Sequence, residues 1–313
     1  MNMELHILKQ ILKNAMDLKK QWKLAARKIF TGKIIVVAYI VCKHGKPVTS
    51  INCNENYCSW YNTDMLNSNG KRTRNLYKPG SKEPFKLSRS RIENFIRCPR
   101  CFYIDRRLGI DQPQGPPFNL NSAVDALLKK EFDVHRSKGE PHPLMKAYGI
   151  DAVPFVHKDL NTWRENFVGV QHMHKPTNLL ITGAVDDIWI NPKDELIVVD
   201  YKATSKDTEV NIDAAWQDSY KRQMEIYQWL LRKNKFKVSD TGYFVYCNAR
   251  KDARAFDGKL EFDIKLIPYT GDDNWIEDIL ENIKETLDAD ALPNPNPACE
   301  FCAYRESARK VEE

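Results

Sequence analysis

Two apolar segments joined by a short turn constrain the fold of this chain most strongly. Residues 179–190 and 195–201 are rich in strand-forming residues, and the intervening Asn-Pro-Lys-Asp at 191–194 favours a turn. This pattern predicts a β-hairpin. The run Leu-Ile-Val-Val at 196–199 is apolar on both faces of a strand, so we expect the second strand to lie in the centre of its sheet.

Further helices and strands are predicted on both sides of this hairpin. We expect a short helix capped by Ser88, a helix capped by Asn121 or Ser122, strands at 242–247 and 260–267, and a helix at 275–287. The second of these helices carries an apolar stripe of Val124, Leu127, Leu128 and Phe132. A long helix at 214–233 has a stripe of Trp216, Tyr220, Met224, Tyr227 and Leu231. Together the elements predict an α/β fold with a central mixed β-sheet flanked by helices.

The part before this region has a different composition. Residues 1–30 predict a basic amphipathic helix that could contact DNA phosphates, and residues 43–84 are turn-rich and polar, as in a linker. The apolar run at 34–42 is about half the roughly 20 residues of a membrane span, and a buried strand accounts for it better. We therefore expect an N-terminal extension at 1–75, a domain at 76–313, no membrane insertion and a cytoplasmic location.

The amino-acid composition is that of a globular protein, and the net charge would allow it to bind a nucleic acid. The chain is 42% hydrophobic and 29% charged, which excludes a disordered polyelectrolyte. The net charge of +6 suits a polyanionic partner, although the pI of about 8.7 is below that of dedicated nucleic-acid-binding domains.

Acidic residues occur where the predicted hairpin is otherwise apolar. Asp186 and Asp187 follow Gly-Ala-Val at 183–185, and Asp200 follows the aliphatic run of the second strand. Burying an ionised carboxylate costs several kcal/mol unless it is paired or binds a metal. Two such acids brought together by a hairpin indicate a divalent cation, and oxygen ligands favour Mg²⁺ or Mn²⁺.

Lys202 supplies a cation beside this acidic pair. Because side chains alternate along a strand, Asp200 and Lys202 project from the same face, and the side chain of Tyr201 points to the other face. The backbone carbonyl of Tyr201 is a further candidate metal ligand. This arrangement favours metal-assisted hydrolysis of a phosphodiester, in which Lys202 orients the nucleophile or stabilises developing charge. The alternative is a structural ion pair of Asp186, Asp200 and Lys202, with Asp187 exposed to solvent.

Two polar residues on the long helix extend the pattern. Gln223 and Tyr227 lie four residues apart, so both project from the apolar face of the helix. The series Gly-x-x-Asp, Asp-x-Lys and Gln-x-x-x-Tyr over residues 85–305 resembles the RecB-like branch of the PD-(D/E)XK nucleases, which includes AddB-type helicase-nucleases and CRISPR-associated exonucleases. The resemblance implies a restriction-endonuclease-like core.

The resemblance also implies roles for individual residues. It implies metal ligation by Asp186, Asp200 and the carbonyl of Tyr201, catalysis by Lys202, and support of the site or the DNA by Gln223 and Tyr227. This branch usually carries a histidine ligand on an early helix, where the present sequence has Asp125. Aspartate can bind Mg²⁺ or Mn²⁺. On the same helix, Lys129, Lys130 and His135 are expected to be surface groups.

Four of the eight cysteines are spaced as chelating pairs. Cys98 and Cys101 form one Cys-x-x-Cys pair, and Cys299 and Cys302 form another about two hundred residues later. Several RecB-like nucleases close the domain with an iron-sulfur cluster, usually held by one upstream and three downstream cysteines. The two-and-two arrangement here leaves zinc as the alternative. The remaining cysteines are expected to be ordinary: Cys42, Cys53, Cys58 and Cys247.

The sequence therefore predicts a DNA nuclease, and more specifically an exonuclease, in repair, recombination or defence. Its expected partners are DNA, including single strands or free ends, and a helicase or another repair or defence protein. Two alternatives remain: a catalytically inactive protein that binds DNA or acts as a scaffold, and a zinc-binding interaction module without a nucleic-acid role.

Overall fold

A computed structural model describes residues 71–113, 115 and 118–313, and the backbone of four short strands before them. The chain divides into two units, Met1–Arg74 and Asn75–Glu313. In the first unit, strands β1 (Lys23–Ala25) and β2 (Tyr39–Val41) pair antiparallel, as do β3 (Ile51–Asn54) and β4 (Tyr57–Trp60).

Predictions for the first unit can be compared only at those strands. The helix predicted at 1–30 lies outside the described residues except at Lys23–Ala25, which form β1 instead. The strand predicted around 34–42 is described only at Tyr39–Val41, which form β2. Residues 43–84, expected to be a linker, contain the β3–β4 hairpin. The side chains of Cys42, Cys53 and Cys58 lie outside the described residues.

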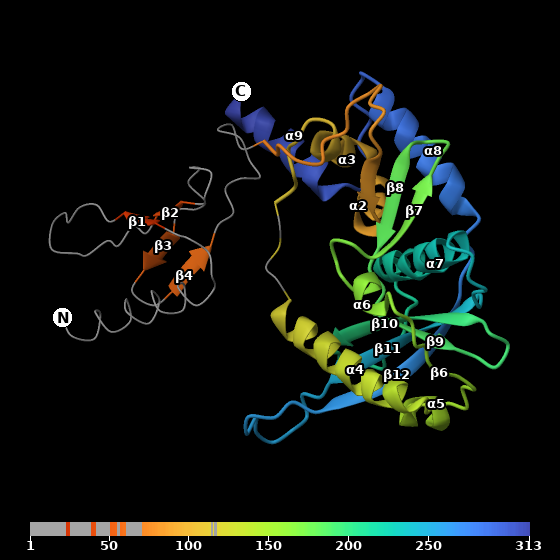
Figure 1. The fold of residues 1–313 in the computed structure, drawn as a ribbon. Coiled ribbons are helices and arrows are strands. Elements are labelled where there is room, and N and C mark those ends of the chain that lie inside the picture. The colour runs from red at the N-terminus through yellow and green to blue at the C-terminus, as the bar shows by residue number, and fades with distance from the viewer. Residues whose placement is uncertain are drawn as a thin grey trace. The chain divides into compact units, whose positions relative to one another are not determined.

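The second unit is built on a five-stranded mixed sheet (Figure 1). Its order is β12 (Phe262–Thr270), β11 (Thr241–Ala249), β10 (Leu196–Thr204), β9 (Asp187–Ile190) and β6 (Val153–Pro154). β10 and β11 are parallel, and the other neighbours are antiparallel. The predicted hairpin is confirmed as β9–β10, and β10 is the central strand, as its apolar run indicates.

A smaller, three-stranded sheet has the order β5 (Phe85–Ser88), β8 (Leu179–Gly183) and β7 (Val170–His174). The segment 179–190, predicted as one strand, is therefore two strands in two sheets. The reason lies at Gly183, where a Cβ atom would come within 2.7 Å of the Tyr227 ring. Strand β8 thus ends in close contact with helix α7 (Asp218–Lys233), and the chain changes sheets across residues 184–186.

Helices cover both faces of the large sheet. Helix α4 (Asn119–Lys138) packs on one face against β10, and α7 packs on the other face and also contacts β7 and β8 (Figure 1). The apolar core is accordingly split by β10, whose Ile197 and Val199 pack under α4, whereas Leu196 and Val198 pack on the α7 side.

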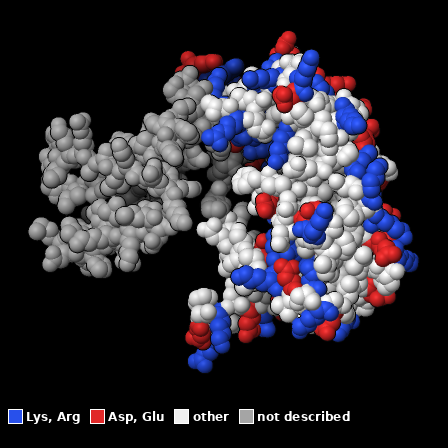
Figure 2. Space-filling model, viewed as in Figure 1, with Lys and Arg blue, Asp and Glu red and all other residues white. Residues whose placement is uncertain are grey.

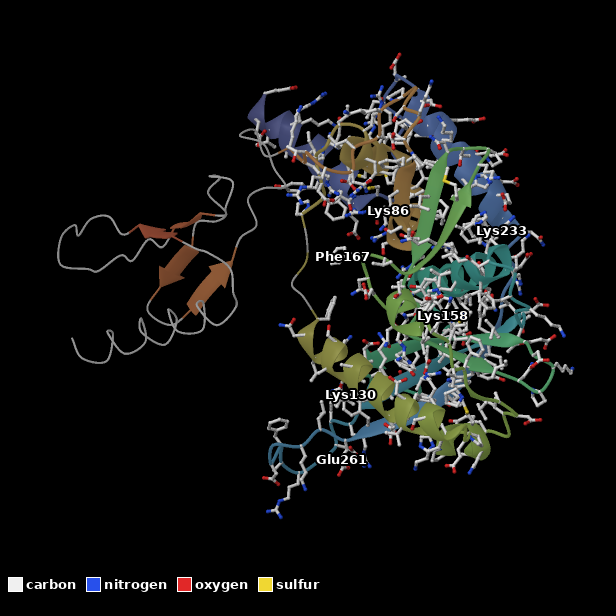
Figure 3. All side chains as sticks on the ribbon, in the orientation of Figure 1. Lys86, Lys130, Lys158, Phe167, Lys233 and Glu261 are labelled. Carbon is white, nitrogen blue, oxygen red and sulfur yellow. The ribbon has the colours of Figure 1, made fainter. Side chains whose placement is uncertain are left out.

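Other helices lie around these two layers. They are α2 (Arg89–Arg97), α3 (Pro99–Arg106), α5 (Pro143–Ala147), α6 (Leu160–Trp163), the 3₁₀ turn η2 (Ala215–Gln217), α8 (Trp275–Asp288) and α9 (Glu300–Glu312). Helices α2 and α3 contact α8. The Lys86 ammonium on β5 donates to the carbonyl of Phe167 in the loop before β7 (Figure 3). Within the described residues, none of the helices combines the length and the apolar character that a membrane span requires.

Two predicted helix starts differ in detail. Ser88 precedes α2, but its side chain makes no capping hydrogen bond. Helix α4 begins at Asn119, two residues before the predicted cap. The Asn121 side chain instead donates to the carbonyl of Ala203 at 3.2 Å, so it ties the helix to the end of β10.

Candidate active site and four-cysteine cluster

The end of strand β10 places Asp200 and Lys202 on the face that contacts α7. Asp200 is fully buried and Lys202 is half-buried. One carboxylate oxygen of Asp200, Oδ1, accepts a hydrogen bond from Gln223 Nε2 at 2.6 Å. The other, Oδ2, forms an ion pair with the Lys202 ammonium and accepts no hydrogen bond from the described residues. This carboxylate oxygen remains able to bind a cation.

The electrostatics of Asp200 reflect its burial. Burial raises the pKa of Asp200 to about 6, and the nearby Asp186 carboxylate acts in the same direction. Lys202 and Arg89 oppose this rise by stabilising the charged form. A buried carboxylate that lies next to a second carboxylate is favourable for binding a divalent cation.

Asp186 lies where the chain passes from β8 to β9. Its Oδ2 accepts a hydrogen bond from the backbone N–H of Tyr201 at 2.9 Å. That contact connects the sheet junction directly to the end of β10. Asp186 and Asp200 are therefore brought to the same place, but by a loop and a strand rather than by two strands of one hairpin.

Asp125 on α4 lies near Asp186, and the side chain of Lys129 lies between these two acids. The Lys129 ammonium donates to Asp125 Oδ2 at 2.8 Å and to Asp186 Oδ1 at 3.4 Å. Burial raises the pKa of Asp125, and Asp186 adds to this rise. Lys129, expected to be a surface group rather than a ligand, is half-buried, because the spacing of one helical turn brings its ammonium onto Asp125. Lys130 is exposed on α4, as expected (Figure 3).

Gln223 and Tyr227 connect the site to helix α7. The amide nitrogen of Gln223 donates to Asp200 and, at 3.0 Å, to the Tyr227 hydroxyl, and its oxygen lies 3.3 Å from the Lys202 ammonium. Both side chains are buried. The four-residue spacing on α7 therefore produces one polar network in an apolar stripe.

Arg89, at the first position of α2, is a site residue that the sequence did not reveal. Its guanidinium hydrogen-bonds to Tyr227 and is close to Asp200. Burial lowers the pKa of Arg89, but Tyr227, Asp200 and Glu93 together more than offset that effect. An arginine following a short strand is too common a pattern to have indicated this position.

A second charged cluster supports the site from the α4 side. Asp187 is fully buried and accepts hydrogen bonds from Arg136, Arg164 and the Tyr201 hydroxyl. Arg164 also donates from Nε to the backbone carbonyl of Asp186 at 3.1 Å, and both arginines bind Asp133. The alternative in which Asp187 is exposed to solvent is wrong. Asp187 instead holds the backbone that carries Asp186.

We expect Asp187→Asn to lower the free energy of unfolding by about 3 kcal/mol, because it leaves two buried arginines with one carboxylate partner. Chemical denaturation monitored by circular dichroism measures this change. The control is Asp194→Asn in the exposed β9–β10 turn, where φ is 59° and asparagine is equally suited. If Asp187→Asn lowers the free energy of unfolding no more than Asp194→Asn does, the charged cluster around Asp187 does not stabilise the fold.

The four cysteines predicted to form two chelating pairs come together. Their sulfur atoms all lie within 4.8 Å of one another, and the shortest separation, Cys101 Sγ to Cys302 Sγ, is 3.5 Å. A disulfide needs about 2.05 Å, so these are free thiols. Burial favours the neutral thiol of Cys98, but backbone N–H groups of Cys101 and Asn296 lower its pKa to about 7. This donor set can hold a metal ion or cluster.

The two candidate metal sites differ in how closely their ligand atoms gather. Among the described residues, the four cysteines are the one group of potential ligands whose atoms already lie close enough together to hold a metal. Asp125, Asp186 and Asp200 pair with ammonium groups instead, and of these three acids only Asp125 lines the nearby cavity. A space of about 100 Å³ is lined by Asn121, Val124, Asp125, Tyr201, Lys202, Ala203 and Tyr220.

Comparison with known proteins identifies the class of protein that this fold and site define. The family model of the PD-(D/E)XK nuclease superfamily matches residues 86–307, and the chain belongs to this family. A search of curated proteins finds no match. One solved structure, described as "Crystal structure of SSO0001", is similar with 17% identity over 72% of this chain and 86% of its own length, with a TM-score of 0.33.

Proposed function

We propose that this protein is a metal-dependent DNA nuclease of the RecB-like branch, acting as an exonuclease in repair, recombination or defence. The observation that carries the proposal is the Asp200–Lys202–Gln223 network, which meets Asp186 and Asp125 at the open end of β10. Membership of the nuclease superfamily supports the interpretation of this network as a site for phosphodiester hydrolysis. DNA is the proposed partner, together with a helicase or another repair or defence protein, in the cytoplasm.

The oxygen donors fit Mg²⁺ or Mn²⁺. Asp125, Asp186 and Asp200 would hold the ion, and the partner of Asp200 Oδ2 among the described residues is the Lys202 ammonium. Strand β9 pairs with β10 only as far as Val199, so the β10 edge beyond it is open. Since the N–H of Tyr201 points to Asp186 at that edge and the N–H and carbonyl of one strand residue point the same way, the Tyr201 carbonyl is the fourth ligand that we propose. When bound, the ion supplies Lewis-acid activation of water and phosphate.

The chain's own residues then position the reacting groups. Lys202 holds a positive charge next to Asp200, where negative charge develops on the phosphate during hydrolysis. Gln223 fixes both Lys202 and Asp200 by hydrogen bonds, and Tyr227 fixes Gln223. These contacts keep the ammonium oriented before DNA binds, which lowers the reorganisation needed during the reaction.

The test is hydrolysis of end-labelled single-stranded and duplex DNA by the purified full chain. We expect products in Mg²⁺ or Mn²⁺ and none in EDTA, and the order of product lengths separates exonuclease from endonuclease cleavage. The same preparation of Asp200→Asn controls for contaminating nucleases. Intact DNA in every metal would contradict the proposal.

One observation favours a second candidate, an inactive nuclease fold that binds DNA or acts as a scaffold. Lys129 lies between Asp125 and Asp186, where its ammonium can replace a metal ion. If this holds, DNA binding without hydrolysis is expected in all metals, and Lys129→Ala should create a measurable Mn²⁺ affinity that the unmodified chain lacks.

A further inference from the structure

Trp216 is placed differently from the buried stripe that the sequence predicts. It lies in the 3₁₀ turn η2 before α7, and 56% of its surface is exposed. The next residue, Gln217, is fully buried and fixes the turn through hydrogen bonds with the Ala214 N–H at 3.0 Å and the Asn211 carbonyl at 2.7 Å. A rigid turn therefore holds a large indole ring in solvent, and exposed aromatic groups of this kind commonly mark binding surfaces.

The exposed ring is continuous with the candidate active site. Trp216 packs edge-to-face on Tyr220, with ring centroids 5.5 Å apart. Tyr220 in turn lies 4.3 Å from the Lys202 ammonium and lines the same small space as Asp125. The two aromatic residues thus form a path from the surface to the group proposed to act on phosphate.

A second lysine accompanies the outer ring. The Lys206 ammonium lies 5.3 Å from the centroid of Trp216. Its backbone is held on both sides by Asn248, which accepts from the Lys206 N–H at 2.8 Å and donates to the Lys206 carbonyl at 3.0 Å. Each ring on the path therefore has one ammonium group beside it, Lys206 at Trp216 and Lys202 at Tyr220.

This pairing of ring and cation matches one repeating chemical unit. A nucleic-acid strand offers a flat base and a negative phosphate in alternation, and proteins bind unpaired strands by stacking bases on aromatic rings and contacting phosphates with cations. On the face shown in Figure 2, positive and negative side chains are interspersed rather than gathered into one basic patch. A ring paired with a lysine binds a nucleic-acid strand more specifically than a general basic patch does.

We infer that Trp216 and Lys206 form a subsite for an unpaired nucleobase and its adjoining phosphate, next to Lys202. A base within a duplex has both faces covered by its neighbours and cannot stack on Trp216. The subsite therefore favours single strands and frayed ends over blunt duplex. This inference rests on the proposed function for the identity of the ligand, but it concerns binding rather than hydrolysis.

The test compares DNA binding by the full chain and its variants in EDTA, where the proposed hydrolysis does not occur. The probe is a fluorescent single-stranded oligothymidylate, with a blunt duplex as the comparison. We expect Trp216→Ala to weaken single-strand binding by about 5- to 100-fold and duplex binding by less than about two-fold, because each stacked base contributes about this much. Trp216→Phe keeps an aromatic ring and should therefore retain most of the affinity of the unmodified chain for the single strand.

Two controls separate stacking from other effects. Tyr148→Ala removes an aromatic residue of similar exposure, 46%, at the end of α5 and should change nothing. Lys206→Ala should reduce the slope of log affinity against log salt by about 0.7, the value for one contact with single-stranded phosphate. Thermal unfolding of each variant verifies that the fold is retained, as expected for two exposed aromatic residues and a half-buried lysine.

The outcomes distinguish the subsite from the proposed enzyme activity. If the unmodified chain hydrolyses DNA but Trp216→Ala binds the single strand equally well, the subsite is wrong and the nuclease stands. If no metal supports hydrolysis but Trp216→Ala loses single-strand binding, the subsite stands and the nuclease is wrong. Equal losses for single strand and duplex, or an unmodified chain that binds no single strand, would overturn the subsite and favour a protein partner for Trp216.

Discussion

Replacing Lys202 with methionine should lower the rate of DNA hydrolysis by about 10²- to 10³-fold, the usual effect of removing one group that stabilises transition-state charge. Methionine preserves much of the side-chain length but has no charge. The loss has a second cause, because Lys202 also lowers the pKa of buried Asp200. Without it, the pKa of Asp200 rises above about 6, and less of the carboxylate is available to bind metal at neutral pH.

Single-turnover rates at saturating Mg²⁺ or Mn²⁺ measure this effect. Lys158→Met, at an exposed position far from β10 in the sequence, is the matched control and should retain full activity (Figure 3). The circular dichroism spectrum of Lys202→Met should match that of the unmodified chain, since Asp200 can accept a proton when its partner is removed. Undiminished hydrolysis by a folded Lys202→Met protein would remove Lys202 from the mechanism.

Replacing Cys101 with serine should lower the free energy of unfolding by more than about 4 kcal/mol, as expected when a structural metal ligand is lost. For a domain of this size the melting temperature should fall by roughly 8 °C or more. The reason is topological. The cluster joins the start of α3 to α9 across about two hundred residues, so it fastens the first helices of the domain to its last one.

Metal analysis and the visible spectrum measure the cofactor directly. An iron-sulfur cluster, which the sequence resemblance implies, would give a brown protein with iron and sulfide, whereas zinc would give a colourless protein with one zinc ion. Cys247→Ser is the matched control, because Cys247 is a buried free thiol in β11, outside the four-cysteine cluster. A preparation without either metal, in which Cys101→Ser is as stable as Cys247→Ser, would contradict the metal role.

The elements with regular periodicity were predictable from sequence. The apolar run and the turn at 191–194 were sufficient to predict the β9–β10 hairpin and its central strand, because burial on both faces leaves a clear pattern. The same alternation placed Asp200 and Lys202 on one face. Each cysteine pair was recognisable from its local Cys-x-x-Cys spacing. The meeting of the two pairs depends on the fold, and the structure confirms it.

The break between β8 and β9 was not predictable in the same way. Ala184 and Val185 continue the apolar character of β8, and the interruption accompanies the close packing of Gly183 against Tyr227. Trp216 fits the helical stripe by spacing, but α7 begins at Asp218, and the preceding 3₁₀ turn directs the indole outward. Arg89 and Lys129 reach the site with long side chains, whose direction depends on neighbours distant in sequence.

The order of residues along the chain has a consequence for biosynthesis. Every residue proposed to bind the metal or to act in catalysis, from Asp125 to Tyr227, is translated after Cys101 and before Cys299. At about 5 to 20 residues per second, the roughly two hundred intervening residues take about 10 to 40 s to emerge from the ribosome. The thiols of Cys98 and Cys101 must therefore stay reduced during that interval, and a metal can complete the four-cysteine cluster only after nearly all of the domain has been made.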